Sequence, residues 1–266
     1  ESPDNDIIER FRKKKARQDA EKALLSQAAE GESRTKSGRL VRIKANVGTL
    51  DDLPEAIAYH CDGIGLTRSE YIYMQSNDWP DEDSQYEFYK EVLASMPEKR
   101  VTIRTCDLGM DKTVSYLSDE KEENPALGMR GIRLSLSKPE MFFTQIRALL
   151  RASSYGQLSI MFPMVSSEGE LDKALELARE AREQLESEGV VMGDDVHYGV
   201  MIETPAAAVM SDRLAKEVDF FSCGTNDLTQ YTLACDRQNN DLGRFYDPHH
   251  LSVVRLLKMV VENAHK

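Results

Sequence analysis

Charged side chains follow several short apolar runs of this sequence. Arg68 and Arg104 come directly after two such runs, Glu203 follows a third, and Asp227 lies just beyond a fourth. A guanidinium group pairs through two parallel hydrogen bonds with a carboxylate or a phosphate. Mg²⁺ usually takes one or two protein carboxylates and completes its shell with substrate and water. These residue types therefore indicate an anionic ligand that is held together with a divalent cation.

Three further residues could complete such a site, and each also has a structural interpretation. Arg237 is a third candidate anion binder, although a single arginine often forms only a surface ion pair. Asn226 could donate its amide to a phosphate oxygen or cap the following helix. Asp227 could likewise cap this helix, and Glu203 could be a salt-bridge partner. Lys112 could bring a positive charge from a loop, where an exposed lysine is the plainer interpretation.

The apolar runs alternate with segments of helical periodicity, which predicts a parallel sheet whose strands are connected by helices. Strands are predicted over seven segments, 40–48, 63–67, 101–106, 130–136, 158–165, 197–203 and 220–225. In a closed βα barrel the carboxyl ends of all strands face one rim, where active sites lie. The polar residues that follow these strands are therefore expected to converge.

The predicted architecture is a TIM-type (β/α)8 barrel that lacks its eighth strand, because only seven strands are counted before Lys266. Residues 39–266 form this incomplete barrel, and residues 1–38 form a preceding linker helix and loop. The helix is expected over residues 5–30, where helix-favouring residues are frequent and apolar residues recur at helical spacing. Its basic run at residues 10–17 fits a solvent-facing helix surface better than a nucleic-acid site.

Composition excludes several classes of protein. The 266 residues carry a net charge of −12, which argues against a general nucleic-acid or anionic-membrane binder. Anion-binding arginines must therefore be clustered locally. The four cysteines form no C-x-x-C pair, as is typical of free thiols in a reducing compartment, and no apolar run is long enough to cross a membrane. We expect a cytoplasmic protein without membrane insertion.

Five motifs in a fixed order make the sequence recognisable. They are GLTRSEY at 65–71, RTCDLGMDK at 104–112, ENPALGMR at 123–130, IMFPM at 160–164 and FSCGTNDLTQY at 221–231. Together they resemble the Enzyme I family of the bacterial phosphoenolpyruvate:sugar phosphotransferase system. The resemblance covers nearly the whole chain and is to the C-terminal, phosphoenolpyruvate-binding domain of that family.

The resemblance implies a TIM-type barrel that dimerises through this domain and uses Mg²⁺. It also implies an enzyme that transfers the phosphoryl group of phosphoenolpyruvate to a protein histidine and so feeds sugar uptake. The substrate-binding residues of the family fall on Arg68, Arg104, Arg130, Asn226, Asp227 and Arg237. Its metal-binding carboxylates fall on Glu203 and Asp227.

Some parts of the family pattern lie outside this sequence or depart from it. The phosphorylated histidine belongs to an N-terminal domain, through which a histidine-containing phosphocarrier protein is expected to bind. The cysteine that protonates the substrate belongs to the eighth strand, expected beyond Lys266. The chain alone is therefore expected to be inactive, and no catalytic residue is assigned within it. Met110 stands where the family usually has glycine, which leaves the role of the neighbouring Lys112 open.

Two alternatives remain at this point. One is the related barrel of phosphoenolpyruvate synthase or pyruvate phosphate dikinase, which would share the arginines and both carboxylates. The other is a non-catalytic ligand-binding or dimerisation module. The stretches 107–112 and 225–231 favour Enzyme I. A strand ending in a Gly-Met-Cys-Gly type motif after residue 266 would mark an enzyme.

Overall fold

The computed structural model describes residues 4–29, 31–109 and 122–266. Within these ranges, six strands form one sheet in the order β1-β2-β3-β4-β5-β6, and every neighbouring pair is parallel. The strands are β1 (Ala45–Val47), β2 (Ile64–Arg68), β3 (Arg100–Arg104), β4 (Gln157–Phe162), β5 (His197–Ile202) and β6 (Phe220–Cys223). The parallel α/β class is therefore confirmed, with six strands arranged as a half-barrel.

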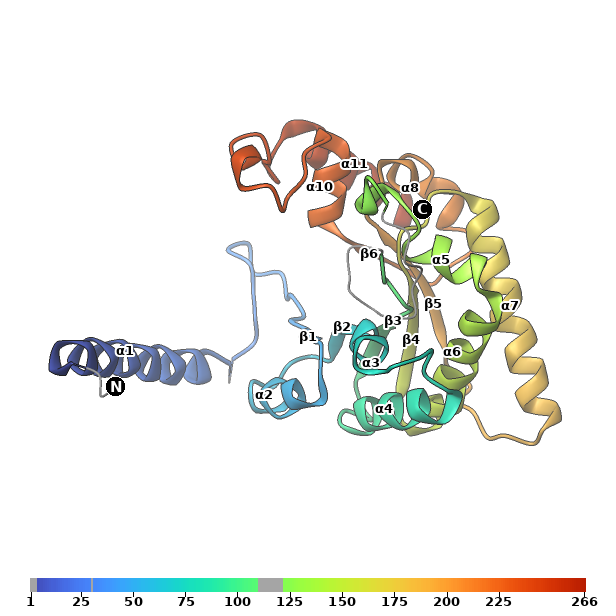
Figure 1. Ribbon diagram of the computed structural model, residues 1–266, viewed down its shortest axis with the longest axis horizontal. Coiled ribbons are helices and arrows are strands. Elements are labelled where there is room, and N and C mark those ends of the chain that lie inside the picture. The colour runs from blue at the N-terminus through green and yellow to red at the C-terminus, as the bar shows by residue number, and fades with distance from the viewer. Residues whose placement is uncertain (1–3, 30, 110–121) are drawn as a thin grey trace.

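Helices connect the strands and cover the convex side of the curved sheet (Figure 1). They are α2 (Leu53–Ala58), α3 (Glu70–Gln75), α4 (Glu82–Ala94), α5 (Ile132–Ser137), α6 (Pro139–Ala152), α7 (Glu168–Ser187), α8 (Pro205–Val209), α9 (Ser211–Leu214), α10 (Thr225–Leu233) and α11 (Leu251–Ala264). Four short 3-10 turns accompany them in the described residues, at Leu50–Asp52, Pro125–Leu127, Ser153–Tyr155 and Asn240–Leu242. After β5, the chain forms two short helices, α8 and α9, one directly after the other.

The strand predicted over residues 130–136 is wrong, because this segment forms a turn followed by α5. Its apolar residues alternate, but a short apolar run does not distinguish a strand from a buried helix. Gly131 adopts φ +57° at the start of α5, and a Cβ there would lie 2.8 Å from the Cβ of Met164. The chain therefore turns sharply before α5, and β3 pairs directly with β4.

The first predicted strand is shorter than expected. Only Ala45–Val47 pairs with β2, whereas Leu40, Val41 and Ile43 are exposed and lie outside the sheet.

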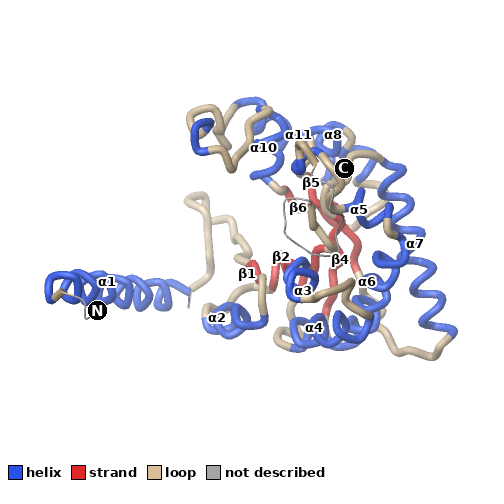
Figure 2. The backbone as a smooth tube through the Cα atoms, in the orientation of Figure 1, coloured by secondary structure: helices blue, strands red, loops and turns tan. Residues whose placement is uncertain are grey.

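Residues 5–29 form α1 (Asn5–Ala29), in agreement with the predicted helix. Figure 2 shows α1 extending away from the sheet, and Phe11 on it is 67% exposed. Helix formation here thus rests on local propensity rather than on packing.

The core lies between the sheet and helices α4, α6 and α7, which contact one another in that order. Phe142 of α6 meets Phe162 of β4 edge to face, with ring centroids 6.1 Å apart. Ile103, Ile160 and Leu149 are fully buried beside them. Each such side chain contributes about 1.5–3 kcal/mol on burial, so this layer fixes where the strand ends lie.

In the described part of the chain, no helix is long and apolar enough to span a membrane.

Candidate functional site

The predicted polar residues follow the strands at one edge of the sheet. Arg68 and Arg104 are register partners at the ends of β2 and β3. Glu203 comes directly after β5, where Thr204 ends the strand by capping α8 through its hydroxyl, which accepts from the Ala207 N–H at 3.0 Å. Asp227 lies in the first turn of α10, just after β6. The parallel topology therefore brings these residues to the same rim.

Arg104 is buried at the centre of this rim, with 8% of its surface exposed. Its Nη1 lies 3.0 Å from Oδ2 of Asp107, and its Nη2 forms an ion pair with Oε1 of Glu70. Burial alone would lower the pKa of Arg104, but the Asp107 and Glu70 carboxylates together raise it above its ordinary value. The guanidinium thus stays charged and is fixed in orientation.

Asp107 joins Arg104 to a second arginine. Both of its oxygens accept from Nη2 of Arg130, at 3.1 and 3.2 Å. Nη1 of Arg130 lies 3.5 Å from the hydroxyl of Tyr231 on α10, and this hydroxyl donates to the Ala126 carbonyl. The ion pair and the tyrosine tie the turn before α5 to the helix that carries Asp227.

Glu203 is buried among other carboxylates, with 1% of its surface exposed. Burial and the charges of Asp107 and Asp227 raise its pKa to about 8, against the opposing effect of Arg104. Its Oε1 accepts from the Met164 N–H at 2.7 Å. Met164 adopts φ +59°, a conformation that costs a non-glycine residue about 1–3 kcal/mol. The surrounding fold therefore holds the Met164 backbone in a strained conformation, in which its N–H points at the Glu203 carboxylate.

Gly224 allows β6 to pass close to Glu203. A Cβ at this position would lie 2.7 Å from the Cβ of Glu203 and 2.9 Å from its Oε2. Any larger residue would push the two strand ends apart. Glycine here is a packing requirement of the rim.

Asp227 has a buried oxygen that accepts no hydrogen bond. Its Oδ1 is enclosed, and Nη2 of Arg237 lies 3.4 Å away without a hydrogen bond in the described residues. The Nε of Arg104 is likewise buried, with no hydrogen-bond partner in the part of the chain that the structure describes. Buried polar atoms are nearly always satisfied in native proteins. An unsatisfied acceptor and donor at one rim suit a site that binds a cation and an anion.

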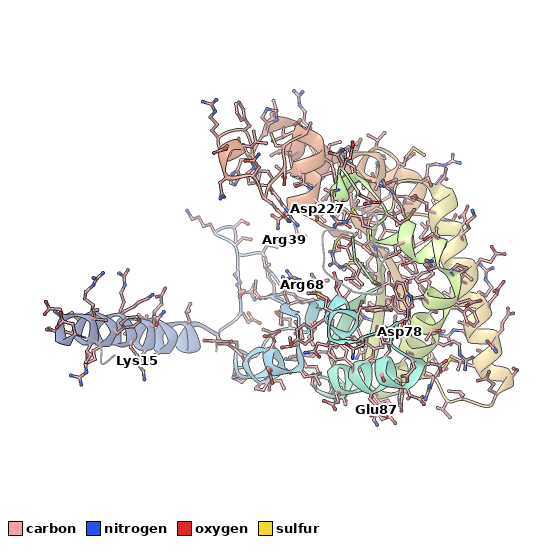
Figure 3. All side chains as sticks on the ribbon, viewed as in Figure 1. Lys15, Arg39, Arg68, Asp78, Glu87 and Asp227 are labelled. Atoms are coloured by element: carbon pink, nitrogen blue, oxygen red, sulfur yellow. The ribbon has the colours of Figure 1, made fainter. Side chains whose placement is uncertain are left out.

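The structure brings together five of the predicted site residues, Arg104, Arg130, Glu203, Asp227 and Arg237. Arg68 and Asn226 are exposed. Figure 3 shows Arg68 at β2 and Asp227 on α10, separated along the edge of the curved sheet. Tyr246 donates to the backbone carbonyl of Asn226 at 3.1 Å. Lys112 and Met110 lie outside the described residues.

Three residues with clear contacts in the site were not predicted as members. They are Glu70, Asp107 and Tyr231. Asp107 could have been found, because it is a carboxylate three residues beyond Arg104 at the same strand end. Glu70 and Tyr231 lie on helices, and only tertiary packing brings them to the arginines.

In residues 4–29, 31–109 and 122–266, no three His, Cys, Asp or Glu side chains gather so as to hold a metal by themselves. Zinc-like sites with three or four protein ligands are therefore not indicated there. Glu203 and Asp227 form a pair of buried carboxylates, one with an unsatisfied oxygen. This donor set fits Mg²⁺, which needs few protein oxygens.

The raised pKa of Glu203 predicts a pH-dependent stability. Its folded pKa of about 8 lies above its ordinary value of 4.5, so the native state holds a proton that the unfolded state releases. The unfolding free energy should fall as pH rises from about 4.5 to 8. In Glu203→Gln the charge cannot form, and this part of the pH dependence should disappear. Urea unfolding of both proteins in chelator at pH 5.5, 7 and 8.5 measures the difference, and parallel pH profiles would contradict the prediction.

Comparison with known proteins defines the class of this chain. Residues 22–266 match the family model of the PEP-utilising enzyme, PEP-binding domain, so the chain belongs to this family. It is 46% identical over 265 residues to a phosphoenolpyruvate-protein phosphotransferase of Staphylococcus aureus (strain MSSA476). It is 45% identical to the proteins of the same name from Geobacillus stearothermophilus and Staphylococcus carnosus (strain TM300).

These matches cover nearly the whole chain but only 46% of each relative, so the chain spans about half the length of the curated relatives. A crystal structure of a citrate lyase from Burkholderia xenovorans LB400 aligns over 68% of this chain and 47% of its own, at 18% identity. Its TM-score of 0.41 is too low to carry an argument.

Proposed function

We propose that this chain binds phosphoenolpyruvate with Mg²⁺, as part of an enzyme that moves the phosphoryl group to a protein histidine. The observation that carries the proposal is the rim itself. Arg104 is buried and Arg130 is largely buried, and both are paired with Asp107. At the same rim, Oδ1 of Asp227 is buried and has no hydrogen bond from the described residues. The family match and the names of the relatives support the same substrate and reaction.

The residues of the chain would act by binding and orientation. Phosphoenolpyruvate carries a phosphate and a carboxylate, and guanidinium groups pair with both. Arg104 and Arg130 are held in place by Asp107, so little side-chain freedom is lost when an anion binds. Arg68 and Arg237 are more exposed and can close on the ligand from solvent. Phosphoryl transfer depends mostly on such positioning and on charge neutralisation.

Glu203 and Asp227 would hold the metal. When bound, Mg²⁺ neutralises charge on the phosphoryl oxygens. Before binding, burial and its acidic neighbours raise the pKa of the Glu203 carboxyl to about 8, so this carboxyl is mostly protonated at neutral pH. The protein therefore avoids two neighbouring carboxylate charges before the cation binds. Asn226 beside Asp227 can donate its amide to a phosphate oxygen.

The finer features that the sequence indicated belong to the same proposal. They are a complete eight-stranded barrel, a linker segment over residues 1–38, a homodimer, a cytoplasmic location, and a histidine-containing phosphocarrier partner. Sugar uptake is the process that this reaction would feed. The alternatives of a phosphoenolpyruvate synthase or a pyruvate phosphate dikinase are less supported, since the matched relatives named above are all phosphoenolpyruvate-protein phosphotransferases.

Binding can be tested on the chain itself. Ligand-observed NMR should detect phosphoenolpyruvate binding that strengthens with Mg²⁺. Glycerol phosphate, which lacks the carboxylate, should bind more weakly, because fewer arginines can pair with it. Affinity is expected to be low, because Arg68 and Arg237 are exposed to water, which screens their charges. Absence of binding, or equal binding of both compounds, would contradict the proposal.

A further inference from the structure

A buried side-chain amide lies behind the rim. It is placed between the turns after β2 and β3, which carry charged residues of the rim. Gln145 of α6 is fully buried and makes three hydrogen bonds. None of them involves a residue predicted for the site. Two of the three reach the backbone or side chain of the segments that follow β2 and β3.

The first contact holds the turn after β3. Thr105 continues the sheet pairing, since its N–H donates to the Met161 carbonyl at 2.9 Å. The next N–H, of Cys106, leaves the sheet and donates to Oε1 of Gln145 at 2.9 Å. Asp107 follows immediately and pairs with the rim arginines. Gln145 therefore holds the backbone at Cys106, where the chain leaves the hydrogen-bonded sheet.

The second contact holds the turn after β2. Nε2 of Gln145 donates to Oγ of Ser69 at 3.1 Å. Ser69 lies between Arg68, the last residue of β2, and Glu70, which pairs with Arg104. One amide group thus spans both turns that carry the charges of the rim.

The third contact fixes the orientation of this amide. Nε2 also donates to the hydroxyl of Tyr89 at 2.9 Å, while that hydroxyl donates to Oε1 of Gln85 at 3.2 Å. Gln85 is held in turn by the Pro80 carbonyl at 2.9 Å and the Tyr73 hydroxyl at 3.1 Å. All four side chains are fully buried. A buried network in which the members are paired is rigid and has one arrangement.

We propose that Gln145 is a positioning residue for the anion site, which locks the turns after β2 and β3 in register. It touches neither ligand nor metal, and acts through Ser69 and Cys106. The proposal rests on the proposed function, because the ligand that the rim binds is taken to be phosphoenolpyruvate. Loss of the amide would let Asp107 and Glu70 shift, and misplacement of about 1 Å can cost about 100-fold in a reaction.

The test compares two identical substitutions in the same network. Gln145→Met keeps the side-chain length and leaves the Cys106 N–H and the Ser69 hydroxyl without this partner. Gln85→Met removes an equally buried amide that contacts neither turn. Phosphoenolpyruvate affinity with Mg²⁺, the thermal unfolding midpoint, and hydrogen exchange of the Cys106 N–H are measured for both. A third variant, Ser69→Ala, removes one contact and is milder should Gln145→Met fail to fold.

Both methionine variants should lower the unfolding midpoint. Gln145→Met should weaken phosphoenolpyruvate binding about 10-fold or more and speed exchange of the Cys106 N–H relative to global unfolding. Gln85→Met should weaken binding less, because Gln85 reaches the two turns only through Tyr89 and Gln145. Ser69→Ala should weaken binding by about 2- to 10-fold, the worth of one hydrogen bond. Equal weakening by Gln85→Met, or unchanged affinity in Gln145→Met, would overturn the proposal. Absence of binding by the unsubstituted chain would instead contradict the proposed function, and Cys106 exchange alone would then decide the role of Gln145.

Discussion

Arg104→Met should lower the unfolding free energy by about 3–5 kcal/mol and abolish phosphoenolpyruvate binding. The stability loss follows because the substitution removes the buried cation that Glu70 and Asp107 share, with only 4% of each carboxylate side chain exposed, although Asp107 keeps its ion pair with Arg130. Removing one partner of a buried ion pair typically costs this much. Urea unfolding at pH 7 measures the stability loss, and ligand-observed NMR measures the loss of binding.

A matched control lies at the other end of the same strand. Arg100 begins β3 and pairs with Asp195, whose side chain is 68% exposed. Since water can solvate this carboxylate again, Arg100→Met should cost only about 1 kcal/mol. If the two substitutions proved equally costly, burial of the rim ion pairs would not be the source of the effect.

The fold class could be predicted because the alternation of strands and helices depends on local sequence. The rim could be predicted in part for the same reason. Arg104 ends β3, Glu203 directly follows β5, and Asp227 lies in the first turn of the helix after β6. Parallel pairing then brings them together without further information. The strand predicted over residues 130–136 was wrong, because alternating apolar residues fit a strand and a short buried helix equally well.

Other members of the site depend on packing that no local pattern reveals. Glu70 is one carboxylate among many, and becomes a partner of Arg104 only where α3 starts beside β3. Gln145 lies far along the chain from Ser69, and meets it because α6 crosses behind the ends of β2 and β3. The pKa of Glu203 depends on the three-dimensional proximity of Asp107 and Asp227. These features follow from the fold rather than from motif spacing.

Arg237→Ala should reduce phosphoryl transfer by about 30- to 1000-fold while leaving stability nearly unchanged. A charge-assisted contact to an anion in the transition state is worth on the order of 2–4 kcal/mol. The side chain is 35% exposed, and its Nη2 approaches Asp227 at 3.4 Å without a hydrogen bond, so folding gains little from it. Binding and stability are thus separable at this residue, unlike at Arg104.

Transfer can be measured in a hybrid in which this chain replaces the matching 265 residues of the Staphylococcus aureus relative. Arg213→Ala is the control, since Arg213 forms a surface ion pair with Glu168 at 3.0 Å, with side chains 56% and 40% exposed. Arg237→Lys adds a second comparison, because lysine keeps the charge but loses the planar fork. Full activity in Arg237→Lys would mean that charge alone matters at this position. Full activity in Arg237→Ala would remove Arg237 from the anion site and leave Arg104 and Arg130, the two less exposed arginines, as its binders.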